Sequence, residues 1–403
     1  MAEEFEIKYF DVGQGDCILI VCPDGKLVMI DCGSSKGLYA GSVELLNVCT
    51  GLREFTSKNN GKIDILILTH KDKDHYNQVY QVFTARTIVE ETTQHLPRVD
   101  IDTVYFSSPA VTSTNYALTQ FTVNSTGAHL IGGSYKTQTI KQVFINAAEQ
   151  KEVTYTKATN FALASGTTKS IKGNKLTLLS DTTPAGKAWS VSIIAGQVPE
   201  KPGKPGQKKL DPTNALSLCT LLQFDNSKAL FLGDATIETE IFLLAKHKNL
   251  IKDIDFVHVP HHGSRTSSHQ NFVNNVNPKG AEVTHEPYET GNRLPKYNVL
   301  DRWLTKLELQ REFVDDHALD YWMEVKEAKY NAILKAWKDA GIKPVKDGRT
   351  TYVARVPRTS KDRFIAVYKT SNQFWALYRK KTDLNLWGVG ADDFNKWSLP
   401  VVV

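Results

Sequence analysis

Two imidazoles and two carboxylates lie within six residues of this sequence, at His70, Asp72, Asp74 and His75. Imidazole nitrogens and carboxylate oxygens are ligands that proteins offer to Zn²⁺, Mn²⁺ and Mg²⁺. The segment directly follows a mostly apolar run, residues 63–69, which is typical of a strand buried on both faces. A loop at the end of such a strand can turn several of these side chains into one pocket. The alternative is a solvated charged loop in which two Lys balance two Asp.

The same residue types follow two more apolar runs. Asp234 ends the run LFLGD, and His261 and His262 follow the run FVHVP. A lone His-His pair is more often structural than functional. Three strand ends that carry Asp or His are, however, what a metal site along one edge of a sheet requires. Together the three groups predict a divalent-metal centre.

The patterns around these residues indicate an α/β fold. Residues 4–11 alternate apolar and polar side chains, and residues 17–22 and 26–31 flank an Asp-Gly pair that is typical of a hairpin. Hairpins followed by buried strands that alternate with helices favour two sheets covered by helices, an αβ/βα sandwich. We also expect a helix near residues 137–150, mainly helical structure over 300–340, and short aromatic-rich strands from Thr350 onward.

Composition sets outer bounds on the protein. A chain of 403 residues can form one large domain with additions, or two domains. Its apolar runs are shorter than the roughly 20 residues that span a bilayer, and its first residues do not resemble a secretory signal. We therefore expect a cytoplasmic protein without membrane contact. Five cysteines, an odd number without a CxxC pair, argue against a disulfide framework and against a zinc-thiolate site.

Positive charge is concentrated near the end of the sequence. Residues 342–382 hold eleven Lys and Arg against two Asp, a net charge of +9, and interleave them with aromatic residues. Cations bind backbone phosphates, and exposed aromatic rings stack on bases. The alternative is a small β subdomain with an aromatic core and solvated cations. The candidate nucleic-acid-binding residues are Arg355, Arg358, Arg363, Lys369, Arg379, Lys380 and Lys381.

Five strings in their order, DVGQGDCILI, VMIDCG, ILTHKDKDHYNQ, LFLGDATIETE and VPHHGS, resemble the metallo-β-lactamase superfamily. More narrowly, they resemble the soluble domain of ComEC-type DNA-uptake proteins and their stand-alone relatives, which carry HxDxDH where the superfamily at large carries HxHxDH. The resemblance covers roughly residues 5–300. It implies a metallo-β-lactamase αβ/βα sandwich over residues 1–300, with an insertion at about 107–215. Residues 301–403 would then form a C-terminal α+β extension.

The resemblance also implies roles for the ligand candidates. His70 and Asp72 would bind one metal, Asp74 and His75 the second, and Asp234 would bridge the two. One of the two adjacent histidines would complete the second site. We favour His261, because it comes first after the strand, with His262 behind the ligands or near the substrate.

Two more acidic roles follow from the same resemblance. Asp31 would orient ligands or water, and Asp74 would orient the nucleophile besides binding metal. The catalytic candidates are therefore Asp74, His262 and Asp31.

The sequence departs from the superfamily pattern in two places. The further His that many members supply to the first metal is missing, and Asn214 matches an asparagine often seen in the ComEC-type branch near that point. An oxygen-rich, weak first site is therefore expected, which favours Mn²⁺ or Mg²⁺ while leaving Zn²⁺ open. The GHP motif of the branch is degraded to Asn-Arg-Leu-Pro at residues 292–295.

Other polar residues near the motifs are candidates for substrate contact. Ser264 and Arg265, just after HHG, could contact a phosphate, and Asn214 is a further candidate; ordinary loop polarity is the alternative. The GQG at residues 13–15 leads into a strand and lacks a third glycine, so we interpret it as a tight turn and not as a dinucleotide fingerprint. That turn would place Asp11, Gln14 and Asp16 near the mouth of the site.

The resemblance implies a hydrolase that uses two divalent cations to activate water and to polarise the scissile group. Because the ComEC-type branch is linked to DNA degradation, we expect a nuclease or phosphodiesterase with nucleic acid as its substrate. One alternative is a hydrolase of a small phosphodiester or ester, such as a cyclic nucleotide or a choline phosphoester. The other is a catalytically silent, metal-stabilised binding module.

Overall fold

The structure is a computed structural model of the chain. It describes residues 4–35, 43–84, 86–89, 92–95, 99–106, 141–146, 151–155, 158–159, 162–163, 167–170, 175–196, 198, 213–285, 294–308, 317–339, 345–347, 351–353, 363–369, 373–382, 386–388 and 395–398. Within these ranges, no helix is long and apolar enough to cross a membrane.

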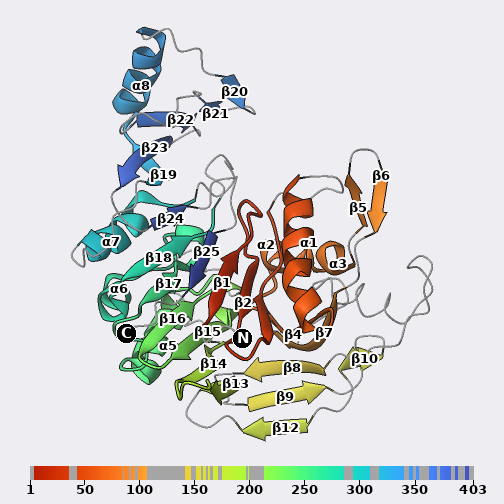
Figure 1. Cartoon of the computed structure of the whole chain (residues 1–403). Coiled ribbons are helices and arrows are strands. Elements are labelled where there is room, and N and C mark those ends of the chain that lie inside the picture. Colours follow the sequence, from red (N-terminus) through yellow and green to blue (C-terminus); the bar gives the residue numbers. More distant parts are fainter. Residues whose placement is uncertain are drawn as a thin grey trace.

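The first sheet has nine strands in the order β12-β9-β8-β7-β4-β3-β2-β1-β25 (Figure 1). Neighbours from β1 to β3 are antiparallel, whereas β3, β4, β7 and β8 run parallel. The helix expected near residues 137–150 is wrong, because β8 pairs there with β7 and β9. The bounds are β1 Glu6–Tyr9, β2 Ile18–Val21, β3 Leu27–Ile30, β4 Lys62–Leu68, β7 Asp100–Phe106, β8 Lys141–Asn146, β9 Lys151–Tyr155, β12 Thr167–Ser170 and β25 Asn395–Ser398.

The second sheet has seven strands in the order β13-β14-β15-β16-β17-β18-β24. It is antiparallel as far as β16 and parallel from β16 to β24. The bounds are β13 Leu176–Thr182, β14 Ala188–Ala195, β15 Cys219–Phe224, β16 Ser227–Phe231, β17 Phe256–His258, β18 Gly280–Val283 and β24 Leu386–Gly388.

Three apolar clusters show how the layers stack. One lies between the sheets and joins residues such as Ile20 and Ile67 of the first sheet to Val191 and Phe231 of the second. A second joins the other face of the first sheet to helices α1 (Val43–Thr56) and α3 (Val79–Thr84). The third joins the second sheet to α5 (Ile237–His247), α6 (Gln270–Val276) and α7 (Tyr297–Glu308), which lie on the opposite side (Figure 1). This arrangement confirms the αβ/βα sandwich.

A smaller α+β unit follows α7. Its sheet has the order β19-β23-β22-β21-β20, and α8 (Glu327–Asp339) packs Tyr330, Ile333 and Trp337 against it. The prediction of mainly helical structure over 300–340 is wrong for β19, whose nine residues all pair with β23. Strands β24 and β25 then pair with β18 and β1 of the sandwich. The bounds are β19 His317–Val325, β20 Val345–Asp347, β21 Thr351–Val353, β22 Arg363–Lys369 and β23 Phe374–Thr382.

Short elements complete the described chain. They are α2 (Lys73–Tyr76) after β4, the hairpin β5 (Arg86–Val89) with β6 (Thr92–His95), and the pair β10 (Ala158–Thr159) with β11 (Ala162–Leu163). The predicted insertion begins with residues 107–140, which lie outside the described residues. Its described part adds β8, β9 and β12 to the first sheet and β13 and β14 to the second.

Candidate metal centre

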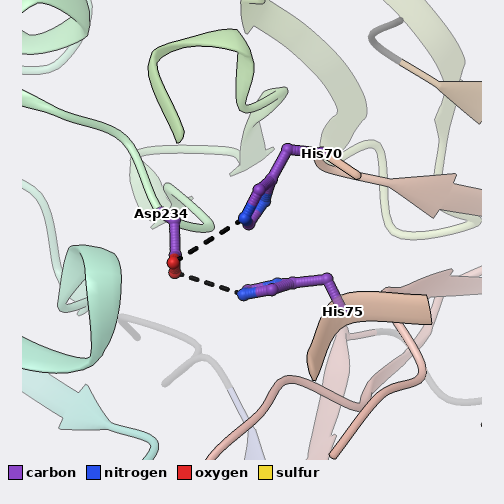
Figure 2. Close-up of side chains that lie close together, drawn as sticks. All are labelled: His70, His75 and Asp234. Carbon is purple, nitrogen blue, oxygen red and sulfur yellow. Dashed lines mark ion pairs between the residues drawn. The ribbon is translucent and has the colours of Figure 1, made fainter. Parts of the chain in front are cut away.

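The predicted ligands meet between the two sheets, where strands of both sheets end. His70 lies two residues after the end of β4, and His75 lies in the single turn of α2. Asp234 follows β16 and reaches the same point from the second sheet. Figure 2 shows both imidazole rings pointing at the Asp234 carboxylate.

Two glycines allow the chain to pack tightly against the turn that carries Asp74 and His75. A Cβ at Gly33 would lie 2.2 Å from the Asp74 carbonyl carbon, and one at Gly15 would lie 2.8 Å from the Asp74 oxygen. Behind them, the Asp16 amide donates to the Asp74 carbonyl at 3.1 Å. The tight GQG turn thus holds the metal-binding turn in place.

The first carboxylate oxygen of Asp234 defines what we call the inner half-site. Asp234 Oδ1 lies 3.2 Å from His75 Nε2 and 3.5 Å from His262 Nε2. Asp74 completes the group, with Oδ2 3.6 Å from His262 Nε2. Asp74, His75 and His262 each have one potential ligand atom that lies within 4.8 Å of the potential ligand atoms of the other two residues. The inner half-site therefore consists of Asp74, His75, His262 and Asp234 Oδ1.

The second oxygen of Asp234 defines the outer half-site. Asp234 Oδ2 lies 3.5 Å from His261 Nε2 and 3.7 Å from His70 Nε2. Asp72 Oδ2 is a further 3.7 Å from His70 Nε2. The outer half-site therefore consists of His70, Asp72, His261 and Asp234 Oδ2.

The adjacent histidines His261 and His262 contribute to different half-sites. Sequence reasoning favoured His261 for the second metal, but the structure places His262 beside Asp74 and His75, and His261 on the side of His70. Their turn, Pro260–Gly263, gives both residues left-handed backbones, with φ of 54° and 48°. Such values are uncommon without glycine and cluster at functional sites.

Unpartnered atoms show that divalent cations fit this centre. His70 Nε2, His75 Nε2, His262 Nε2 and Asp234 Oδ1 are buried and have no hydrogen-bond partner within the described part of the chain. Leaving such atoms unpaired costs about 1–3 kcal/mol each. Each half-site offers two imidazole nitrogens and two carboxylate groups, a donor set that suits Zn²⁺ and Mn²⁺.

Asp31 fixes the ring of His75, in the orienting position that the sequence predicted. Its Oδ2 accepts from His75 Nδ1 at 2.7 Å, and Oδ1 accepts from the Thr69 amide, also at 2.7 Å. The Thr69 hydroxyl donates to the same carboxylate at 2.6 Å. With Nδ1 committed as a donor, Nε2 of His75 is left as the metal-binding atom.

A second buried support lies behind His262 and was not predicted. His262 Nδ1 donates to the Thr284 carbonyl at 2.8 Å, and the Thr284 hydroxyl donates to Asp16 at 2.6 Å. Asp16 is fully buried, so its predicted place near the mouth of the site is wrong. In the sequence, the only hint of the Thr284–Asp16 hydrogen bond is the position of Asp16 next to the GQG turn. No sequence pattern singles out Thr284.

The carboxylates and the imidazoles of the centre shift one another's pKa values. Burial alone would raise the pKa of each carboxyl, but the neighbouring histidines hold the pKa of Asp234 well below its usual value and lower that of Asp74 to about 2. Burial opposes the charged form of His262 as well, yet Asp234 and Asp74 raise its pKa to about 9. Protons on these rings hold positions that a cation would take, so metal uptake releases protons.

The candidate substrate contacts are engaged within the protein. Asn214 Nδ2 lies 3.0 Å from His261 Nε2. The Ser264 hydroxyl lies 3.1 Å from that of Thr266, which in turn lies 2.7 Å from His261 Nδ1. Arg265 is half exposed and forms a 3.6 Å ion pair with Glu324 of β19. Asn214 and Thr266 thus support His261, a role that the sequence did not suggest for Thr266.

The basic candidates lie in the small α+β unit or outside the described residues. Arg355 and Arg358 fall outside the described ranges. The backbones of Arg363, Arg379, Lys380 and Lys381 lie on β22 and β23. Lys369 is exposed at the end of β22, with its ammonium 5.0 Å from the centre of the Phe374 ring.

Comparison with known proteins gives one family match. Residues 10–109 match the family model described as the Metallo-beta-lactamase superfamily, a quarter of the chain that includes His70, Asp72, Asp74 and His75. No curated protein is significantly similar to the chain in sequence.

Among solved structures, human tRNase Z, short form, is 10% identical, with a TM-score of 0.33 over 70% of this chain and 92% of that one. A mutant of CmlA beta-hydroxylase is 13% identical, with a TM-score of 0.33 over 70% and 46%. A diphosphatase of the PhnP family is 12% identical, with a TM-score of 0.30 over 72% and 92%. Similarities of this size carry no argument about the substrate. The family match and the layered architecture together identify an αβ/βα sandwich of the metallo-β-lactamase fold, in which residues 10–109 carry the superfamily segment.

Proposed function

We propose that this protein is a divalent-metal-dependent hydrolase that cleaves phosphodiester bonds, with DNA as its substrate. One observation carries the proposal: the two oxygens of Asp234 face two separate pairs of imidazole Nε2 atoms, those of His75 and His262 on one side and those of His70 and His261 on the other. A buried carboxylate needs positive charge beside it. Imidazoles that converge on both of its oxygens can hold two cations there in place of the ring protons.

Two adjacent cations suit phosphodiester cleavage. When bound, they would activate a water molecule and neutralise charge on the phosphoryl group. Asp74 is the inner carboxylate with partial exposure, 19% of its side chain, so it can both bind metal and orient the attacking water. Asp31 fixes the orientation of the His75 ring by accepting a hydrogen bond from its Nδ1 atom.

Nucleic acid is proposed as the substrate because of the net charge of +9 over residues 342–382 and the resemblance to ComEC-type proteins, whose HxDxDH pattern includes Asp72. A small phosphodiester or ester substrate, and a silent metal-stabilised module, are the competing functions. The Arg265–Glu324 ion pair connects the histidine turn to the small α+β unit that carries this charge.

The test is a cleavage assay on the full chain with single-stranded DNA, double-stranded DNA, RNA and bis(p-nitrophenyl) phosphate, each with Mn²⁺, Mg²⁺ or Zn²⁺. Asp74→Ala and Asp234→Ala remove ligands of the centre. Asp64→Asn is the matched control, because Asp64 accepts the Leu27 amide at 2.8 Å in the same sheet but belongs to neither half-site.

Metal-dependent DNA cleavage that is lost in both alanine variants and kept in the control would support the proposal. Turnover of the small diester without any cleavage or binding of DNA would replace it with the small-substrate function. Full metal occupancy without turnover of any substrate would refute hydrolysis and leave the binding module.

A further inference from the structure

We propose that the two half-sites bind their cations in order: the inner half-site binds first and retains its cation, and the outer half-site takes a second, exchangeable one. This inference rests on the metal centre of the proposed function. It concerns binding alone, so it can be tested without a substrate.

The inner half-site is already assembled to receive a cation. Its acceptors His75 Nε2, His262 Nε2 and Asp234 Oδ1 are buried and unpartnered among the described residues. Both rings are nearly inaccessible, with 0% and 1% of their side chains exposed. A cation that enters here replaces the ring protons and satisfies several desolvated atoms at once, without breaking a hydrogen bond to another protein group at the Nε2 atoms of the described residues.

The rings of the inner half-site are held by strong acceptors. His75 Nδ1 donates to the Asp31 carboxylate, and His262 Nδ1 donates to a backbone carbonyl. Asp16 adds a second buried carboxylate, 3.7 Å from His75 Nδ1 and 4.0 Å from His262 Nδ1. Carboxylates and carbonyls behind an imidazole fix its orientation and make it a better ligand, and such contacts are worth 10–100-fold in metal affinity.

Among the described residues, the rings of the outer half-site have neutral groups behind them, three hydroxyls and, 3.5 Å from His261 Nδ1, the Asn214 amide nitrogen. His261 Nδ1 lies 2.7 Å from the Thr266 hydroxyl. His70 Nδ1 lies 3.1 Å from the Thr69 hydroxyl and 3.4 Å from that of Ser217. A neutral hydroxyl increases the basicity of an imidazole less than a carboxylate does.

The outer half-site must also rearrange before it binds. Asn214 Nδ2 lies 3.0 Å from His261 Nε2, the atom that a cation would need, so this contact has to break. Asp72 has 39% of its side chain exposed and His261 has 18%, so solvent competes for the same ligands. The outer cation would therefore be the one in exchange with solvent and nearest to an entering substrate.

The experiment measures Zn²⁺ binding to the metal-free full chain by calorimetry at pH 8.5, with metal content after dialysis determined by elemental analysis. We expect two binding steps whose dissociation constants differ by at least tenfold, and about one retained ion per chain. Asp31→Asn should weaken the tight step by about 10–100-fold. Thr266→Val removes a hydroxyl that contacts the outer ring His261 and the Ser264 hydroxyl, neither of which belongs to the inner half-site, so it should weaken only the loose step.

Two steps of equal affinity would overturn the inference, and so would a Thr266→Val variant in which the tight step weakens. Thermal unfolding of each metal-free variant checks that it folds, and the mild Thr266→Val change keeps the test decisive if Asp31→Asn does not fold. Ordered binding without hydrolysis of any substrate would refute the proposed function alone. Hydrolysis with two equal steps would refute the ordered binding alone.

Discussion

Replacing Gly33 with alanine should reduce metal binding and activity, although Gly33 is not a ligand of the metal centre. The added Cβ would lie 2.2 Å from the Asp74 carbonyl carbon, 2.3 Å from its oxygen and 2.4 Å from the His75 nitrogen. Ordinary van der Waals contact begins at 3.4 Å, so the Asp74–His75 backbone would have to move by about 1 Å. A displacement of about 1 Å in a catalytic group can cost roughly 100-fold in rate.

The assay for Gly33→Ala is kcat/KM on the substrate found in the cleavage screen, together with Zn²⁺ binding by calorimetry. The matched control is Gly280→Ala, a glycine of the second sheet whose added Cβ would come no closer than 3.5 Å to Phe256. We expect a loss of about 100-fold in the first variant and little change in the second. A Gly33→Ala protein with activity and Zn²⁺ affinity within threefold of the starting protein would refute the packing argument.

Three further predictions concern pH, metal and salt. Burial raises the pKa of Glu240 to about 8 from 4.5, although it accepts hydrogen bonds from the Ser268 and His269 amides. The folded state therefore holds this proton more tightly than the unfolded state, so the contribution of Glu240 to stability is fully present below pH 4.5 and is lost as the pH rises to 8, by up to about 5 kcal/mol. Denaturant unfolding of Glu240→Gln at pH 5 and pH 8 should show a smaller fall, and an unchanged fall would contradict the assignment. Chelation should lower the thermal unfolding midpoint, because a cation at 100 times its dissociation constant stabilises by about 2.7 kcal/mol; differential scanning calorimetry before and after adding Zn²⁺ back would show whether the midpoint responds. Replacing both Lys380 and Lys381 with alanine should reduce the slope of log affinity for DNA against log salt by about 2, and an unchanged slope would exclude both residues from phosphate contact.

The metal ligands were predictable because each follows a strand that periodicity reveals. The apolar runs before His70, Asp234 and His261 are short and continuous, and the carboxyl ends of such strands meet at a sheet edge. The split between His261 and His262 was not predictable, because it depends on two left-handed residues in succession. Histidine is enriched among non-glycine residues at positive φ, but such residues are too uncommon for two in succession to be expected from residue type.

Contacts between distant segments account for what sequence reasoning missed. Asp16 and Thr284 are 268 positions apart and meet only because the two sheets face each other. β19 was predicted as helix because its strand character depends on pairing with β23, about 60 residues later. The same holds for β8, which gains its partners from β7 and β9. For these segments, pairing with distant strands decides the secondary structure, whatever the helix or strand propensity of the local sequence.

The division of ligands between the two sheets has a consequence for folding. His75 lies in α2, which follows β4 of the first sheet, and Asp234 follows β16 of the second sheet, 159 positions further along the chain. A cation held by both acts as a cross-link between the halves of the sandwich and closes a loop of about 160 residues. Since the unfolded chain lacks this assembled site, the free energy of cation binding adds to that of folding and favours the assembly of both halves. Two separately made halves of this protein should then associate more tightly with the cation than without it.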